Sequence, residues 1–130
     1  MRIFQTRWFA RFSRKEGIGD ALLTDAIQRA ERGMIDAELG GGLIKQRVAR
    51  PSRGRSSGWR TLIAFRSGEI SVFLYGFAKS ARDNVDADEL ADLKTLAGYF
   101  LTLREDVLKH LLMSGDLVEV SDDEPEKDLS

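Results

Sequence analysis

Three successive stretches in the middle of the chain have the period and composition of β-strands. In the first, Ile44 and Val48 fall on one face and Lys45 and Arg47 on the other, so that the two cations share a face. The other two are rich in β-branched and aromatic residues, and a short turn that contains Gly68 joins them. The stretches span residues 43–49, 59–65 and 70–77. The pattern predicts three antiparallel strands in sequence.

Two other regions repeat apolar residues at helical spacing. The first begins at Asp20, a suitable N-cap, and ends before Gly33, which suits the left-handed position after a helix. The second begins at Asp86, with Glu89 placed as its capping-box partner. Its broad apolar stripe predicts a single long helix that continues up to Gly115.

The N-terminal segment has a weaker pattern. Residues 3–6 favour a short strand, and residues 8–14 place Trp8 and two phenylalanines near one side of a possible helical turn. Helices at both ends of the chain can cover one face of the central sheet. We therefore expect an α+β fold: a small antiparallel sheet of three to four strands, with helices packed on one face. The other face would stay partly open to a ligand.

The net charge of −1 conceals a strong asymmetry along the chain. Residues 116–130 contain seven acids and one base, whereas residues 1–115 contain 19 Lys or Arg against 14 Asp or Glu, a net charge of +5. Residues 43–82 alone contain nine bases and one acid, a net charge of +8. This excess suits a polyanion site, although a solvated basic face explains it equally well. We expect one domain over residues 1–115 and an acidic, disordered tail over residues 116–130.

Several classes of site are excluded by composition. Cysteine is absent, which removes disulfides, thiol nucleophiles and cysteine-based zinc sites, and fits a reducing cytosol. No stretch approaches the roughly 20 apolar residues that span a bilayer, and no secretory leader is evident, so we expect a cytoplasmic protein. The glycine run at residues 40–42 lacks the lysine of a phosphate loop. His110 is the single histidine, which excludes a two-histidine ribonuclease mechanism; we expect no metal and no cofactor.

The cations of the predicted strands are candidates for contact with phosphates. Lys45 and Arg47 lie about 6.6 Å apart on one strand face, and antiparallel pairing brings Arg60, Lys79 and Arg82 toward the same end of the sheet. Such a site holds phosphates and stabilises a pentavalent phosphorus. Activation of an RNA 2′-hydroxyl needs a base, and a lysine crowded by arginines suits this role because their charge favours its neutral form. Further candidates for phosphate or base contact are Arg50, Arg53, Arg55, Arg82 and Tyr75.

Three segments resemble the RelE superfamily of type II toxins, and more narrowly its HigB-like branch. They span residues 37–47, 57–66 and 72–84. In order and spacing they are similar to the basic strand, the Gly-aromatic-Arg strand and the lysine-bearing strand end of that family, over about residues 3–112. Members have a fold similar to that of microbial ribonucleases and usually cut mRNA in the ribosomal A site. A cognate antitoxin, often a helix-turn-helix protein in the HigB branch, neutralises them.

The resemblance implies catalytic roles for four cations, Lys45, Arg47, Arg60 and Lys79, with Arg82 as an alternative to the last. It implies an antitoxin, mRNA and the ribosome as partners, with operator DNA reached only through the antitoxin. The best-studied members carry a catalytic tyrosine near the C-terminus, whereas Tyr99 lies in a helical pattern and Tyr75 in a strand, which leaves the base open. We expect a ribosome-dependent mRNA endoribonuclease. An inactive RNA-binding module and a co-repressor component are the alternatives.

Overall fold

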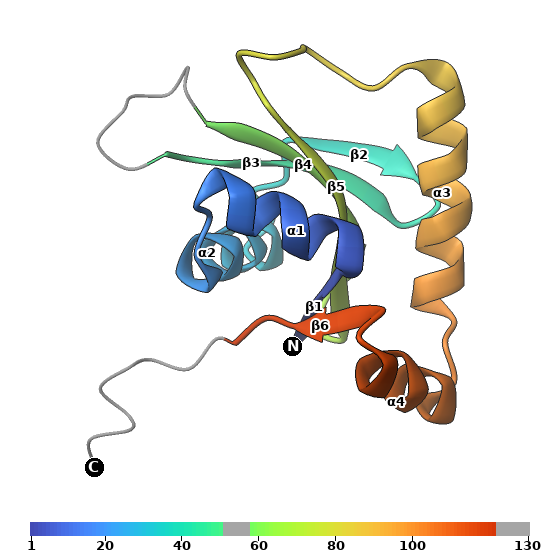
Figure 1. Ribbon diagram of the computed structural model, residues 1–130. Coiled ribbons are helices and arrows are strands. Elements are labelled where there is room, and N and C mark those ends of the chain that lie inside the picture. The colour runs from blue at the N-terminus through green and yellow to red at the C-terminus, as the bar shows by residue number, and fades with distance from the viewer. Residues whose placement is uncertain (51–57, 122–130) are drawn as a thin grey trace.

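A six-stranded sheet with helices on both sides makes up the computed structural model, which describes residues 1–50 and 58–121 (Figure 1). The strands are β1 (Arg2–Thr6), β2 (Ala37–Gly40), β3 (Leu43–Val48), β4 (Trp59–Arg66), β5 (Ile70–Ala78) and β6 (Leu117–Glu119). The helices are α1 (Arg7–Glu16), α2 (Asp20–Glu31), α3 (Ala87–Leu101) and α4 (Glu105–Ser114). The α+β fold class that the sequence predicts is confirmed.

The order of strands across the sheet is β2-β3-β4-β5-β1-β6. The predicted antiparallel succession of β3, β4 and β5 is confirmed, and β1 joins β5 as a parallel neighbour. The expectation of three to four strands was too low, because β2 and β6 are also part of the sheet. Hydrophobic periodicity does not predict either strand, because β2 has only four residues and ends in the glycine run, and β6 has only three.

Two hydrophobic clusters lie on opposite faces of the sheet. Alternation along β4 sends Ile63 toward α1 and α2, whereas Leu62 and Ala64 point toward α3 and α4. Figure 1 shows α1 and α2 on one side and α3 on the other. The expectation that helices pack on one face is therefore wrong. Both faces carry a core, so neither face of the sheet is fully open to a ligand.

The helix boundaries differ from the predicted ones in two places. The capping box of α3 is confirmed, with the Asp86 carboxylate 2.8 Å from the Glu89 amide and the Glu89 carboxylate 2.9 Å from the Asp86 amide. The single long helix was wrong: α3 ends at Leu101, and the chain resumes extended geometry at Arg104 before α4 begins. This break lets α4 turn beneath the sheet. The N-cap of α2 is Gly19, so Asp20 occupies the first turn instead.

The acidic segment begins inside the fold. Leu117 in β6 is buried, and the backbone amide of Val120 donates to the carbonyl of Ile3. Residues 116–121 are therefore joined to the domain, a correction to the boundary expected at residue 115. Residues 122–130 lie outside the described residues, as do Arg53 and Arg55. Within the described ranges, no helix has the length and apolar character to cross a membrane.

Candidate nucleic-acid interface

Lys45, Arg47 and Arg60 share one face of the sheet. Arg47 on β3 pairs with Arg60 on β4, and Arg60 pairs with Phe77 on β5, whose ring belongs to the cluster under α3. Directly paired residues of antiparallel strands have Cα atoms about 4.5–5.5 Å apart. The side chains of Arg47 and Arg60 therefore leave the sheet next to each other. Lys45, two residues from Arg47, points the same way. We call these three residues the sheet cation face.

The buried side chain of Gln46 sets the orientation of β3. Its amide nitrogen donates to the carbonyls of Ala26 and Met34, each at 3.0 Å, and its amide oxygen accepts from the backbone of Asp36 at 3.1 Å. Gln46 thus points toward α2, and its neighbours Lys45 and Arg47 must point to the opposite face. A slip by one residue would bury both cations.

The backbone of Arg47 is held on both sides by other side chains. Its amide donates to the Asp36 carboxylate at 2.6 Å, and its carbonyl accepts a hydrogen bond from the Arg29 guanidinium. These two hydrogen bonds lie beyond the last pair between β2 and β3, Ala37 with Lys45, and hold the C-terminal end of β3. The backbone that carries the Arg47 side chain is therefore held in place by Asp36 and Arg29.

The sheet cation face carries uncompensated charge. All three side chains are half-buried, and within residues 1–50 and 58–121 none of them forms an ion pair. The Nη1 atom of Arg60 is buried and has no hydrogen-bond partner among the described residues. A buried donor without a partner is costly, and a bound phosphate oxygen would satisfy it with a strong charge-assisted bond.

Arg82 lies beside this face but is already paired. Its guanidinium donates to both carboxylate oxygens of Glu89, at 2.6 and 3.1 Å, and to the carbonyl of Asn84 at 2.9 Å. The hydrogen bond to Glu89 raises the pKa of Arg82, and the same bond lowers the pKa of Glu89. The charge of Arg82 is thus compensated by Glu89.

The remaining predicted residues lie around the sheet end. Lys79 is half-buried directly after β5, and its backbone amide donates to the carbonyl of Gly58. Arg50 stacks its guanidinium over Trp59 at 4.6 Å, and Trp59 belongs to the cluster on the α1 side. Arg50 is therefore separated from the sheet cation face. Tyr75 is half-buried and its hydroxyl accepts from Arg82 at 3.3 Å.

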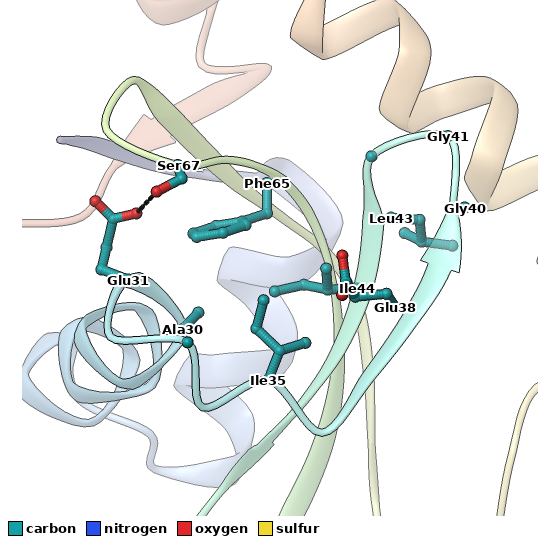
Figure 2. Close-up of a pocket in the computed structure, with 12 residues that line it drawn as sticks. Ala30, Glu31, Ile35, Glu38, Gly40, Gly41, Leu43, Ile44, Phe65 and Ser67 are labelled. Carbon is teal, nitrogen blue, oxygen red and sulfur yellow. Dashed lines mark hydrogen bonds between the residues drawn. The ribbon is translucent and has the colours of Figure 1, made fainter.

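A pocket of about 570 Å³ lies elsewhere, between the end of α2, the β2–β3 turn and β4. Figure 2 shows its apolar lining, including Ile35 and Phe65, and the bond between Glu31 and Ser67 at its edge. Its described lining contains Glu31 and Glu38 but no cation, so it is unsuited to phosphate. Among the described residues, no cluster of three His, Asp or Glu side chains is arranged to hold a metal.

Sequence reasoning overlooked the outer face of α1. Trp8, Arg11 and Lys15 are exposed there, and Trp8 stacks on Tyr75. Their spacing of three and four residues, which places them on one helical stripe, was a usable signal. The signal is weak because the sequence pattern leaves the helical state of residues 8–14 ambiguous.

Comparison with protein families agrees with the architecture. A family model described as the RelE toxin of the RelE / RelB toxin-antitoxin system matches residues 1–120, which is nearly the whole chain. A search among curated proteins finds no significant match. The match extends through β6, so the last strand of the sheet belongs to the family domain. The chain belongs to the RelE toxin family and is a toxin of a toxin-antitoxin system, for which the family implies an antitoxin partner.

Proposed function

We propose that this toxin is a ribosome-dependent mRNA endoribonuclease of the HigB-like branch that acts in the cytoplasm. The observation that carries the proposal is the sheet cation face, in which Lys45, Arg47 and Arg60 project together without acidic partners among the described residues. A phosphodiester in this position would meet up to three positive charges. RNA cleavage through the 2′-hydroxyl adds negative charge to the phosphorus centre, which such a site stabilises.

The proposed reaction is an internal transesterification. A base removes the proton of the 2′-hydroxyl, the 2′ oxygen attacks the phosphorus, and the bond from phosphorus to the 5′ oxygen breaks. The leaving oxygen receives a proton, so the products are a 2′,3′-cyclic phosphate and a free 5′-hydroxyl. Arg47 and Arg60 hold the phosphate, because a guanidinium keeps its proton and presents several donors.

We assign the base to a lysine, either Lys45 on β3 or Lys79 after β5. The choice is decided by single Lys→Ala variants in a single-turnover assay at rising pH. The variant that removes the base loses the pH dependence of the rate. The variant that removes only a binding charge keeps this dependence and weakens binding. If both variants keep the wild-type pH profile and rate, the assignment to a lysine is wrong.

The function itself is tested on purified ribosomes programmed with a defined mRNA. We expect cleavage by the wild-type protein only when the ribosome is present, with products that end in a cyclic phosphate. Growth arrest without any cleavage of mRNA would overturn the ribonuclease assignment. Co-expression of a helix-turn-helix protein from a neighbouring reading frame should restore growth, and failure to do so would remove that partner class.

A further inference from the structure

The outer face of α1 presents an aromatic ring among cations. Trp8 is 46% exposed, and Arg11 and Lys15 follow it at spacings of three and seven residues. Residues at these spacings lie on one stripe of a helix. Arg14 lies beside this stripe and is also exposed. We call Trp8, Arg11 and Lys15 the α1 stripe.

The indole of Trp8 is held in a fixed place. Its ring centroid lies 4.7 Å from that of Tyr75 and 5.5 Å from that of Phe12, both in stacked geometry. The close approach of α1 to β5 depends on Gly76, where an added Cβ would lie 2.8 Å from the ring of Phe12. Trp8 is therefore a rigid ring with an exposed part, which loses little entropy when a ligand stacks on it.

The cations of the α1 stripe are available to a ligand. Neither Arg11 nor Lys15 forms an ion pair within the described part of the chain. Arg7, on the same helix, behaves differently: it pairs with Asp116 at 2.9 Å and donates to the carbonyl of Ser114. Arg7 thus joins α1 to the end of α4, while the charges further along the helix remain uncompensated.

Trp8 is linked to the sheet cation face through aromatic contacts, although α1 itself packs on the opposite face of the sheet. Trp8 stacks on Tyr75, the centroids of Tyr75 and Phe77 lie 6.3 Å apart, and Phe77 is the cross-strand partner of Arg60. A chain of aromatic rings therefore links the exposed indole to the cation that lines the proposed cleavage site.

We propose that the α1 stripe is a second binding surface for single-stranded RNA, with a nucleobase stacked on Trp8 and phosphates bound by Arg11 and Lys15. This proposal rests on the proposed function and adds a subsite to it. Stacking on an aromatic ring flanked by cations is the recognition chemistry of single strands, whose bases are free to leave their own stack. The charges alone would suit an acidic peptide, but that ligand gives no role to the exposed indole.

The first test measures affinity for a fluorescein-labelled, 2′-O-methylated RNA oligonucleotide, which the protein cannot cleave. Trp8→Leu keeps an apolar side chain against Phe12 but removes the ring, and it should weaken binding about fivefold or more. Tyr99→Leu is the matched control, because Tyr99 is a helix-surface aromatic with a similar exposure of 48%. It should leave affinity unchanged.

Fluorescence of the protein supplies an independent readout. The chain has two tryptophans, and Trp59 is only 2% exposed, so Trp8 is the indole that a ligand reaches directly. We expect the oligonucleotide to quench tryptophan emission in the wild type. The quenching should disappear in Trp8→Phe, which retains a ring for binding. Quenching that persists in Trp8→Phe would show that the base does not stack on this residue.

The phosphate contacts are tested by salt dependence. The double variant Arg11→Ala/Lys15→Ala should reduce the slope of log affinity against log salt by about 1.4, since each contact to a single strand contributes about 0.7. The control is Arg32→Ala/Lys109→Ala, which removes two exposed charges outside α1, one just after α2 and one on α4. An unchanged slope in the first variant would overturn the phosphate role.

Two outcomes separate this proposal from the proposed function. If Trp8→Leu and the double variant bind RNA normally while Arg60→Ala abolishes ribosomal cleavage, only the α1 stripe is wrong. If these variants bind RNA normally but fail to capture the antitoxin, the stripe belongs to the antitoxin interface. Absence of ribosomal cleavage by the wild type would instead remove the proposed function, whatever the oligonucleotide affinities are.

Discussion

Two arginines, Arg60 on the sheet cation face and Arg82 beside it, have opposite surroundings. Arg60 has a buried nitrogen without a hydrogen-bond partner among the described residues, whereas Arg82 is bound by both oxygens of Glu89. In the sequence the two look alike, since each lies in the basic region and close to an aromatic strand. The difference shows that the availability of a cation depends on what the fold brings next to it. Glu89 comes from a helix that begins after both arginines.

The comparison also separates two roles in the proposed site. A phosphate oxygen would satisfy the nitrogen of Arg60 that lacks a hydrogen-bond partner among the described residues. Arg82 instead joins the start of α3 to β5, because it donates to both Glu89 and the Tyr75 hydroxyl. A bidentate arginine–carboxylate pair has a defined geometry, so it positions its neighbours. We therefore assign substrate contact to Arg60 and a positioning role to Arg82, a division that sequence reasoning did not make.

The largest expected effect is on cleavage by Arg60→Ala. Removing one preorganised donor to a developing negative charge costs about 10²–10³ in rate, so this variant should lose cleavage and no longer arrest growth. Arg82→Ala should reduce the rate far less. Rates are measured on programmed ribosomes, with Arg32→Ala as a control for loss of a surface arginine. Equal losses for Arg60→Ala and Arg82→Ala would erase the distinction between the two residues.

A second variant disturbs the sheet cation face without removing a cation. Gln46→Leu removes the donor to the carbonyl of Met34 and the acceptor for the amide of Asp36, as well as a second bond to the helical carbonyl of Ala26. An unsatisfied buried polar group costs about 1–3 kcal/mol, so the melting temperature should fall by several degrees. At a temperature where the variant is folded, RNA affinity should also fall. Wild-type stability in Gln46→Leu would mean that these bonds do not orient β3.

A third measurement compares Arg47 with Arg82 through the salt dependence of RNA affinity. Arg47→Ala should reduce the slope of log affinity against log salt by about 0.7, the contribution of one contact to a single strand. Arg82→Ala should leave the slope nearly unchanged, because Glu89 already compensates this charge. Binding of the methylated oligonucleotide over a series of salt concentrations gives both slopes. If the slope of log affinity against log salt fell in Arg82→Ala but not in Arg47→Ala, Arg82 rather than Arg47 would be the residue that contacts phosphate.

The smallest expected effect concerns the pH dependence of stability. Arg82 lowers the pKa of Glu89 in the folded state, so this pair stabilises the fold fully above the ordinary glutamate pKa of about 4.3. The contribution is lost as the pH falls from there through the lower pKa of the folded state. Glu89→Gln preserves a side-chain acceptor for the capping box but removes the charge. Denaturant unfolding should separate wild type from variant at pH 7, and the gap should narrow below pH 4.

The strands and caps with strong local signals could be predicted from the sequence. The alternation around Lys45 and Arg47, the turn at Gly68 and the capping box at Asp86 are all properties of a few neighbouring residues. The break between α3 and α4 was missed because the apolar stripe continues across it. The helix ends where Thr102 leaves helical geometry and the guanidinium of Arg66, on β4, donates to the free carbonyl of Leu101 at 2.8 Å, a contact distant in sequence.

The site was predictable only in part, for a different reason. That Lys45 and Arg47 share a face follows from strand period, but the pairing of Arg47 with Arg60 depends on a register between two strands. The neutralisation of Arg82 depends on how α3 docks, and the placement of Trp8 on Tyr75 depends on α1 closing against Gly76. These contacts depend on tertiary structure, and the distribution of charge along the sequence does not predict them.

The position of β1 in the sheet has a consequence for how the chain folds during synthesis. β1 is made first, yet both of its neighbours come much later: Arg2 pairs with Ile70, and Phe4 pairs with Glu119. At about 5–20 residues per second, β1 waits several seconds for β5 and longer still for β6. Pairings this distant in sequence slow folding. We expect the chain to become native only after its last strand has left the ribosome.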